Sequence, residues 1–238
     1  MRKESRVFDR WELKYVVTIK QMYQLMGAVE PYVVMDENGN DGVYKIKSLY
    51  FDSYDFRYYH EKINGNKFRQ KVRLRGYGDI KNDDDVFFEI KQRYNSTVQK
   101  RRVGLKLDDA YELIDDELMD KDKYSKKKLK VLEEIKYLSS MHSLQPKAIV
   151  SYDRKAYMGK YEDGLRITFD TNLKCRKTNM NLEQKSSEQY FIHPGYAVLE
   201  IKTNEKVPIW LISIIQRFSV EAERVSKYCL SVEKLYNL

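Results

Sequence analysis

Basic residues recur at every second position in several segments of this sequence. Arg73 and Arg75 are separated by one residue, and so are Lys100 and Arg102. Residues i and i+2 of a β-strand point to the same face, so each segment would present its charges on one side. Guanidinium groups match phosphate oxygens and lysines add point charge, so such faces could bind a row of phosphates. A carboxylate in the same pattern, such as Glu200, could hold a divalent ion that bridges phosphate oxygens.

The elements that would carry these faces follow from the hydrophobic pattern. Alternation with a period of two predicts about eight strands. They cover residues 7–17, 44–52, 71–77, 86–93, 97–105, 148–157, 165–173 and 197–203. Thr18 and Ser125 precede apolar residues at helical spacing and are predicted N-caps, and Pro208 suits the first turn of a helix over 208–218. Further helices are predicted at 54–63 and 109–118, with a last element that ends at Leu238.

The order of these elements predicts the fold class. Strands in clusters with helices inserted between them indicate an α+β fold. We expect an eight-stranded, mostly antiparallel sheet that closes into a β-barrel, with helices packed outside. No linker rich in Ser, Gly or Pro interrupts the chain, so residues 1–238 are expected to form a single domain.

The charged faces are the informative part of this prediction. Each face could simply be the solvated side of a half-buried strand, but seven strands carry one. Helices outside a closed sheet would cover the apolar faces, so the charged faces would line its interior. The predicted interior cations are Lys14, Arg73, Arg75, Lys91, Arg93, Lys100, Arg102, Arg154, Arg166 and Lys202. The predicted interior acids are Glu12, Glu89, Asp170 and Glu200, and Tyr152 shares the face of Arg154.

An interior of this kind needs an anionic occupant. Like charges at close range in a partly desolvated space are costly when they are unpaired. A short row of phosphates would neutralise them, whereas a nucleic acid duplex would not fit inside an eight-stranded barrel. The interior therefore predicts a dense, narrow polyanion as the ligand.

Composition agrees with an anionic partner without choosing one. The 238 residues include 44 Lys and Arg against 36 Asp and Glu, a net charge of +8, and the pI is near 9.1. Cys175, Cys229 and the three histidines lack ligand spacing, which argues against disulfide scaffolds and zinc sites and favours an oxygen-held metal. The first residues lack a signal-peptide pattern, and no uncharged stretch could span a bilayer, so we expect a cytoplasmic protein without a membrane span.

Short motifs throughout the chain carry a family resemblance. They are Glu12-Leu13-Lys14-Tyr15, Ser48-Leu49-Tyr50-Phe51-Asp52, Lys71-Val72-Arg73-Leu74-Arg75-Gly76-Tyr77, Phe88-Glu89-Ile90-Lys91, Lys100-Arg101-Arg102, Ser151-Tyr152-Asp153-Arg154, Arg166-Ile167-Thr168-Phe169-Asp170, Leu199-Glu200-Ile201-Lys202 and Ser226-Lys227-Tyr228. In this order they resemble the VTC domain, the catalytic core of the vacuolar transporter chaperone polyphosphate polymerases. That domain belongs to the triphosphate tunnel metalloenzyme superfamily.

The resemblance implies a function and assigns roles to residues. It implies a barrel that binds ATP with Mn²⁺ or Mg²⁺, moves the γ-phosphate onto a growing polyphosphate chain and releases ADP. The catalytic phosphate-binding positions that it implies are Lys14, Arg73, Arg75, Lys91, Arg154, Arg166 and Lys227. Additional phosphate-binding candidates are Lys100, Arg102, Tyr152 and Lys202, and the metal candidates are Glu200 and Glu12. Lys227 lies outside the predicted strands, so its role rests on the resemblance alone.

Other functions remain open at this level. An inorganic triphosphatase or nucleoside triphosphatase would use the same site with water as the attacking group. A non-catalytic polyphosphate-binding module has less use for Glu200, and RNA binding lacks a recognised aromatic and basic motif. Tyr15, Tyr50, Tyr77 and Tyr228 are expected to pack within the barrel, and the basic run 121–130 is expected to be a solvated helix face.

The fungal members of this family carry a phosphate-sensing domain and membrane helices that this sequence lacks. Translocation of a polymer would therefore need a separate membrane partner. ATP and polyphosphate are the partners that the resemblance implies, and no nucleic acid is expected.

Overall fold

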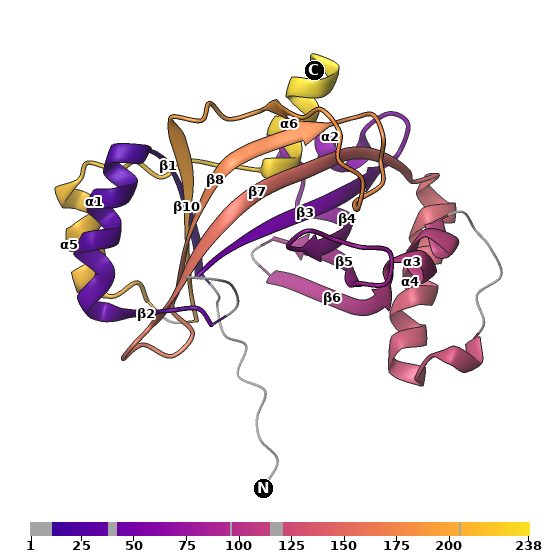
Figure 1. Cartoon of the computed structure of the whole chain (residues 1–238), viewed down its shortest axis with the longest axis horizontal. Coiled ribbons are helices and arrows are strands. Elements are labelled where there is room, and N and C mark those ends of the chain that lie inside the picture. Colours follow the sequence, from indigo (N-terminus) through magenta and orange to yellow (C-terminus); the bar gives the residue numbers. More distant parts are fainter. Residues whose placement is uncertain (1–10, 38–41, 96, 115–120, 205) are drawn as a thin grey trace, which may run out of the picture. The chain divides into compact units, whose positions relative to one another are not determined.

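The computed structural model describes residues 11–37, 42–95, 97–114, 121–204 and 206–238 (Figure 1). The strands are β1 (Trp11–Thr18), β2 (Val33–Met35), β3 (Val43–Asp52), β4 (Phe68–Tyr77), β5 (Asp85–Tyr94), β6 (Thr97–Lys106), β7 (Gln145–Gly159), β8 (Arg166–Arg176), β9 (Gln189–Tyr190) and β10 (Tyr196–Thr203). The helices are α1 (Ile19–Val29), α2 (Arg57–Ile63), α3 (Leu107–Ile114), α4 (Lys126–His142), α5 (Ile209–Arg217) and α6 (Lys227–Tyr236), with 3₁₀ turns at Glu30–Tyr32 and Lys121–Lys123.

The predicted helix starts agree with the structure. Thr18 caps α1 and forms a capping box with Gln21, and Ser125 caps α4 through Lys128 N. Pro208 lies one residue before α5, as its N-cap. Parts of two predicted elements, residues 7–10 and 115–118, lie outside the described residues.

One helix begins later than its pattern predicts. The segment 54–63 was expected to be helical throughout, but α2 starts at Arg57. The buried carboxylate of Asp52 accepts hydrogen bonds from the backbone N–H groups of Tyr58 and Tyr59, which fixes the first turn of the helix there.

The strands form one sheet in the order β1-β10-β8-β7-β3-β4-β5-β6, with β2 paired to β7 and β9 paired to β8. The ladders β1–β10, β10–β8, β3–β4, β4–β5 and β5–β6 are antiparallel, so the predicted α+β class with a mostly antiparallel sheet is confirmed. Across the described residues no ladder joins β1 to β6, so hydrogen bonds do not close the sheet as the barrel prediction required. Closure was inferred from the order of strands and helices, which does not determine whether the two edge strands pair. Carboxylates on the charged faces already pair with cations there.

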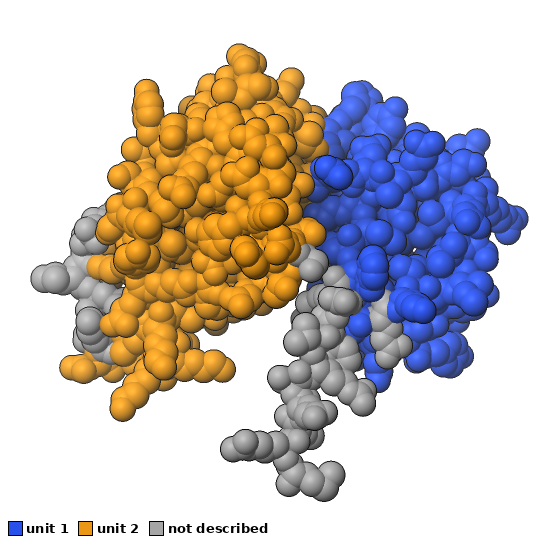
Figure 2. Space-filling view, turned by 180° about the vertical axis from the view of Figure 1, so that it is seen from behind, with its two compact units in different colours: residues 1–44, 152–173, 192–225 blue, residues 45–151, 174–191, 226–238 orange. Residues whose placement is uncertain are grey.

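The chain divides into two compact units (Figure 2). Unit 1 comprises residues 1–44, 152–173 and 192–225, and unit 2 comprises residues 45–151, 174–191 and 226–238. Each unit is built from segments that are distant in the sequence.

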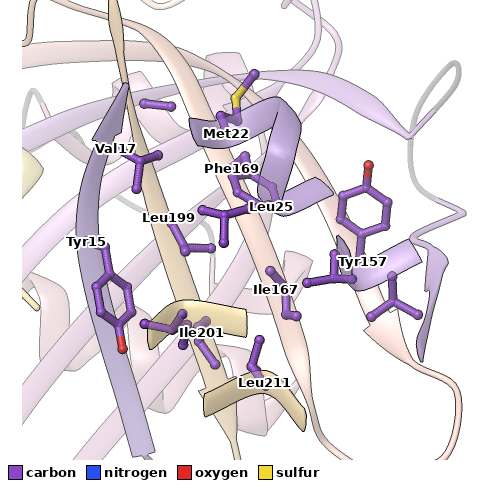
Figure 3. Close-up of a cluster of buried hydrophobic side chains, with 14 of the residues drawn as sticks. Tyr15, Val17, Met22, Leu25, Tyr157, Ile167, Phe169, Leu199, Ile201 and Leu211 are labelled. Carbon is purple, nitrogen blue, oxygen red and sulfur yellow. The ribbon is translucent and has the colours of Figure 1, made fainter. Parts of the chain in front are cut away.

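Unit 1 has a core between helices and the apolar face of its strands (Figure 3). Leu25 of α1 and Leu211 of α5 pack with Ile167, Phe169 and Leu199 of β8 and β10. The charged residues of the same strands, such as Lys14 and Glu200, alternate with these apolar residues and so lie on the opposite face. The helices cover one face of the strands, and the charged side chains lie on the other face, as predicted.

Unit 2 repeats this arrangement with different helices. Val72 of β4 and Phe88 of β5 are buried and line a small apolar pocket with Leu113 of α3 and Ile135 of α4. The charged residues of β4 and β5 occupy the alternate positions, on the other face. In the part of the chain that the structure describes, no helix is both long enough and apolar enough to cross a membrane.

The unit 1 core gives a stability prediction. Leu25 is 1% exposed, so Leu25→Ala should lower the free energy of unfolding by about 2–5 kcal/mol through lost burial and a cavity. Tyr23 on the same helix is 64% exposed, and Tyr23→Ala should change this free energy by about 0.5 kcal/mol or less. Urea unfolding measures both, and equal effects of the two variants would contradict the assignment of this core.

Candidate functional site

The charged face of unit 2 carries a row of three lysines. The strand registers place Lys71, Lys91 and Lys100 as Cα partners across β4, β5 and β6. Like charges directly opposite one another destabilise a sheet. Lys91 is exposed, and Lys100 turns toward a carboxylate of the neighbouring row. The row is thus an arrangement that an anion would stabilise.

The neighbouring row contains the buried carboxylate of Glu89, which is 2% exposed. The nearest N–O distances from Glu89 are 2.6 Å to Arg73, 2.6 Å to Lys100 and 3.6 Å to Arg102. Arg73 and Arg102 are its register partners on either side. Three cations thus surround one carboxylate, which leaves a net charge of +2 in this contact shell.

The titration behaviour of this shell reflects the excess of positive charge. Burial alone would raise the pKa of Glu89, but the charges of Arg73, Arg75 and Lys100 outweigh burial and lower this pKa to about 2. Burial lowers the pKa of Lys100, and the charges of Arg73 and Arg75 lower it further against the opposing effect of Glu89. The lowered pKa of Glu89 indicates a positive potential at this face, which favours binding of an anion.

Arg75 and Arg102 extend the same face. Arg75 is 8% exposed and donates a hydrogen bond to Ser48 Oγ. The guanidinium of Arg102 lies 3.5 Å from the ring centroid of Phe87 and donates to Tyr77 Oη. Arg75 is therefore held by a neutral hydroxyl, and Arg102 by aromatic neighbours as well as by Glu89.

Tyr50 of β3 joins the cluster through its hydroxyl. Arg73 Nη1 donates a hydrogen bond to Tyr50 Oη at 2.9 Å, and the two residues are Cα partners in the β3–β4 ladder. The Tyr50 ring packs against Tyr228 of α6, whose hydroxyl donates to the buried Asp52. This tyrosine was expected to be packing alone, and the structure gives it a polar contact as well.

Lys227 is positioned by contacts of its neighbours in α6. It is 7% exposed and is the first residue of the helix, after the N-cap Ser226. Lys71 Nζ donates to Ser226 Oγ at 2.8 Å and lies over the Tyr228 ring. These contacts bring the start of α6, and Lys227 with it, to the lysine row.

The charged face of unit 1 is organised around a second carboxylate. Glu200 is 5% exposed, and its oxygens lie 3.5 Å from Lys14 Nζ, 3.0 Å from Lys202 Nζ and 3.7 Å from Arg154 Nη2. Lys14 also contacts Glu12 at 3.3 Å. The structure thus brings together five of the predicted site residues.

Arg154 is the most buried cation of this second cluster. It is 5% exposed and forms a bidentate salt bridge with Asp170. Its Nε donates to Asp170 Oδ1 at 2.7 Å, and its Nη2 donates to Asp170 Oδ2 at 2.8 Å. Burial opposes its charge, but Asp170, Tyr152 and Glu200 raise its pKa well above the usual range. Its guanidinium lies 5.3 Å from the centroid of the Tyr152 ring. Three cations and three carboxylates meet in this cluster, so their charges balance. The Glu89 cluster, in contrast, carries a net positive charge.

Arg166 and Arg93 have other contacts. Arg166 donates to Asp36 at 2.8 Å and to Tyr44 Oη at 2.9 Å, and neither partner belongs to the Glu200 cluster. Arg93 is exposed at the end of β5 and donates to the Asn95 carbonyl. The sequence predicted neither partner of Arg166: Asp36 lies outside the predicted strands, and Tyr44 begins a predicted strand but was not among the candidate site residues.

The Glu200 cluster suits a divalent ion whose ligands include both carboxylate and phosphate oxygens. Glu12 and Glu200 each direct an oxygen to the same lysine ammonium, so the two carboxylates converge. The hydroxyl of Thr168, the register partner of Glu200, is buried and has no hydrogen-bond partner among the described residues. Those residues contain no group of three or more His, Cys, Asp or Glu that could enclose a metal. Mg²⁺ is commonly held by one or two carboxylates with phosphate oxygens and waters, and this donor set fits that mode.

Comparison with known proteins shows the family. The VTC domain family matches residues 9–236, so this chain belongs to the VTC domain family. The chain is 24% identical over 277 residues to the vacuolar transporter chaperone complex subunit 4 of Trypanosoma brucei brucei, with 98% of this chain and 35% of the relative covered. The corresponding subunit of Trypanosoma cruzi is 24% identical, with 98% of this chain and 35% of that protein covered. The chain thus spans about a third of the length of these curated relatives.

Solved structures show the fold. A candidate adenylate cyclase from Bacillus halodurans aligns with a TM-score of 0.55 and 13% identity, covering 90% of this chain and 92% of that protein. A candidate adenylyl cyclase from Hippeastrum, described as having a dominant triphosphatase activity, aligns with a TM-score of 0.54 and 13% identity over 94% and 95% of the two chains. These two alignments show that the chain shares its fold with both proteins.

The buried Glu89 gives a prediction with a defined pH dependence. Its depressed pKa means that the charged carboxylate stabilises the folded state above about pH 4.5 and that this contribution is lost as the pH falls toward about 2. Glu89→Gln should lower the free energy of unfolding by about 3 kcal/mol at neutral pH, and the difference from wild type should shrink across that window.

Glu134 provides the matched control for this measurement. It pairs with Arg101 on the helix-covered face, and its side chain is 29% exposed. Glu134→Gln should therefore cost about 1 kcal/mol or less. Denaturant unfolding at several pH values compares the variants, and a Glu89→Gln effect that is equally small or independent of pH would contradict this account.

Proposed function

We propose that this chain binds the triphosphate of ATP on the charged face of unit 2 and transfers the γ-phosphate to a growing polyphosphate chain, with release of ADP. The observation that carries the proposal is the excess of positive charge around Glu89. Three cations contact one buried carboxylate there, and the lysine row lies beside them. Such an excess is costly without an anion, and membership of the VTC domain family supports phosphate as that anion.

The proposed roles follow from the contacts. Arg73, Arg75 and Arg102 would clamp phosphate oxygens, and Lys71, Lys91, Lys100 and Lys227 would add positive charge along the row. Glu89 holds Arg73 in place before the ligand arrives, which lowers the cost of ordering the clamp. Phosphoryl transfer needs mainly positioning and charge neutralisation from the protein, and this face provides both.

The Glu200 cluster would serve the metal-dependent part of the reaction. Glu200 and Glu12 would hold Mn²⁺ or Mg²⁺. Lys14, Arg154, Arg166 and Lys202 would add positive charge for phosphates on the face of unit 1. A bound divalent ion would neutralise charge that develops on the phosphate oxygens. Tyr152 lies against Arg154 and would keep its guanidinium oriented. A terminal phosphate is already anionic, so the attacking group needs no strong general base.

Turnover of ATP tests the proposal directly. Purified protein incubated with ATP and Mn²⁺ should form long phosphate chains on a gel with one ADP per phosphate added. Arg73→Ala should reduce chain synthesis by about 100-fold or more, because it removes a phosphate clamp from a partly buried site. Arg101→Ala is the matched control: Arg101 pairs with Glu134 on the opposite face, and its loss should leave synthesis unchanged. Absence of both chains and free phosphate would contradict an enzymatic role.

Glu200 gives a separate prediction about the metal. Glu200→Gln keeps the size of the side chain but removes a charge from the converging carboxylates. We expect activity to fall and the Mn²⁺ concentration for half-maximal activity to rise by about tenfold or more. A titration of activity against Mn²⁺ measures this, with Glu134→Gln as the control. An unchanged metal requirement would exclude Glu200 as a ligand.

A triphosphatase is the second candidate. The Hippeastrum neighbour with a dominant triphosphatase activity favours it, since water could attack on the same charged faces. Free phosphate in place of chains in the ATP experiment would establish this alternative.

The names of the relatives also suggest an assembly. Subunits 4 and 2 of a vacuolar transporter chaperone complex, from Trypanosoma brucei brucei and Schizosaccharomyces pombe, match this chain. We propose that the chain acts with other subunits, on the cytoplasmic side where ATP is supplied.

A further inference from the structure

Tyr50 is a buried titratable group for which the proposed reaction has no role. It is 6% exposed, and its hydroxyl oxygen accepts a hydrogen bond from Arg73 at 2.9 Å. Its ring is fixed against Tyr228 at a centroid distance of 5.1 Å. The hydroxyl hydrogen has no acceptor among the described residues, so it remains available to a ligand at the Arg73 clamp.

The charges that face Tyr50 are mostly positive. Strand β4 presents Lys71, Arg73 and Arg75, and β5 presents Glu89, which is itself held by Arg73. Helix α6 contributes Tyr228, whose pKa burial and Asp52 raise so far that it stays neutral, with Lys227 beside it in sequence. Asp52, two residues along β3, accepts hydrogen bonds from Tyr58, Tyr59 and Tyr228.

We propose that the Tyr50 hydroxyl is an additional anion-binding group of the Glu89 cluster and that the protein takes up a proton at Tyr50 when this cluster binds a phosphate anion. This inference rests on the proposed function, because it requires the cluster to bind phosphate. It adds the Tyr50 hydroxyl as a hydrogen-bond donor to the phosphate, and it makes the affinity for phosphate depend on pH.

The proton balance follows from the electrostatics. Burial alone would raise the pKa of Tyr50, but the charges of Arg73, Arg75 and Lys71 and the hydrogen bond from Arg73 lower it to about 8. Near that pH about half of the molecules carry a tyrosinate paired with Arg73. An arriving phosphate brings negative charge and raises the pKa again. The tyrosinate oxygen then takes a proton from the solvent, and the neutral hydroxyl donates it to a phosphate oxygen as a hydrogen bond.

The sign of the pH dependence is fixed by this exchange. Below about pH 8 the hydroxyl is already protonated and binding needs no proton. Above that pH the tyrosinate must be protonated first, so affinity should fall with rising pH by as much as tenfold per unit. Loss of the donor in Tyr50→Phe should weaken binding about tenfold near neutral pH and remove this component of the pH dependence.

Isothermal titration calorimetry with tripolyphosphate tests the proton uptake. Measurements near pH 8 in two buffers of different ionisation enthalpy give the number of protons taken up for each ligand bound. Wild type should take up about half a proton more than Tyr50→Phe. Protonation of the ligand itself is common to both proteins and cancels in this difference.

Two control variants assign the proton to Tyr50. Tyr77 lies on the same face, and although burial alone would raise its pKa, Arg75 and Arg102 lower it, so Tyr77→Phe removes the competing titratable group. Tyr94 is 63% exposed on β5 and controls for the loss of any hydroxyl. Both variants should keep the wild-type uptake. Equal uptake in Tyr50→Phe and wild type, or its loss in Tyr77→Phe instead, would overturn the inference.

A second measurement uses the unaltered protein. Tyrosinate absorbs in the ultraviolet, so wild type should show a tyrosinate signal near pH 8 that disappears when tripolyphosphate is added. A signal that does not respond to the bound ligand would overturn the inference while leaving phosphate binding intact. If wild type does not bind tripolyphosphate at all, the proposed function itself fails, and the inference fails with it.

Discussion

The buried carboxylate of Glu89, surrounded by more positive charge than it can neutralise, is the interaction on which the charged face of unit 2 depends. Without Glu89, the charges of Arg73, Lys100 and Arg102 would lose the carboxylate that all three contact in a partly desolvated space. With it, the cations are held in register, yet a net positive charge remains. Glu89 offsets part of the electrostatic repulsion among these cations. The positive charge that remains can still attract an anion.

The two charged faces differ in their balance of charge. In unit 1 the cations Lys14, Arg154 and Lys202 are matched by carboxylates, and the pKa of Arg154 rises although burial opposes its charge. In unit 2 the cations are in excess, and the pKa values of Lys100 and Glu89 fall. A balanced, acid-containing cluster suits a divalent ion, and a positive cluster suits the phosphates themselves. Each unit reaches its arrangement in the same way, with helices on the apolar face of the strands.

Much of this arrangement follows from period-two patterns, because alternation fixes which residues share a face. The caps at Thr18 and Ser125 were likewise evident, since hydroxyl side chains precede helical spacing there. The register between neighbouring strands was not evident from the sequence. Pairing of Tyr50 with Arg73, or of Lys71 with Lys91, depends on how strands align, and no local pattern encodes it. Lys71 lies two residues before Arg73 and so shares the strand face of Arg73 and Arg75. The same period-two spacing would therefore have added Lys71 to the candidate site residues.

The central claim is that phosphate neutralises the charges which the fold gathers on the charged face of each unit. Thermal unfolding with increasing tripolyphosphate measures this most directly, because a ligand that binds only the folded state stabilises it in proportion to the logarithm of its concentration. The account predicts a rise in the unfolding temperature for wild type and Arg101→Ala, and none for Arg73→Ala combined with Arg154→Ala. Equal rises in all three proteins, or no rise in wild type, would contradict it.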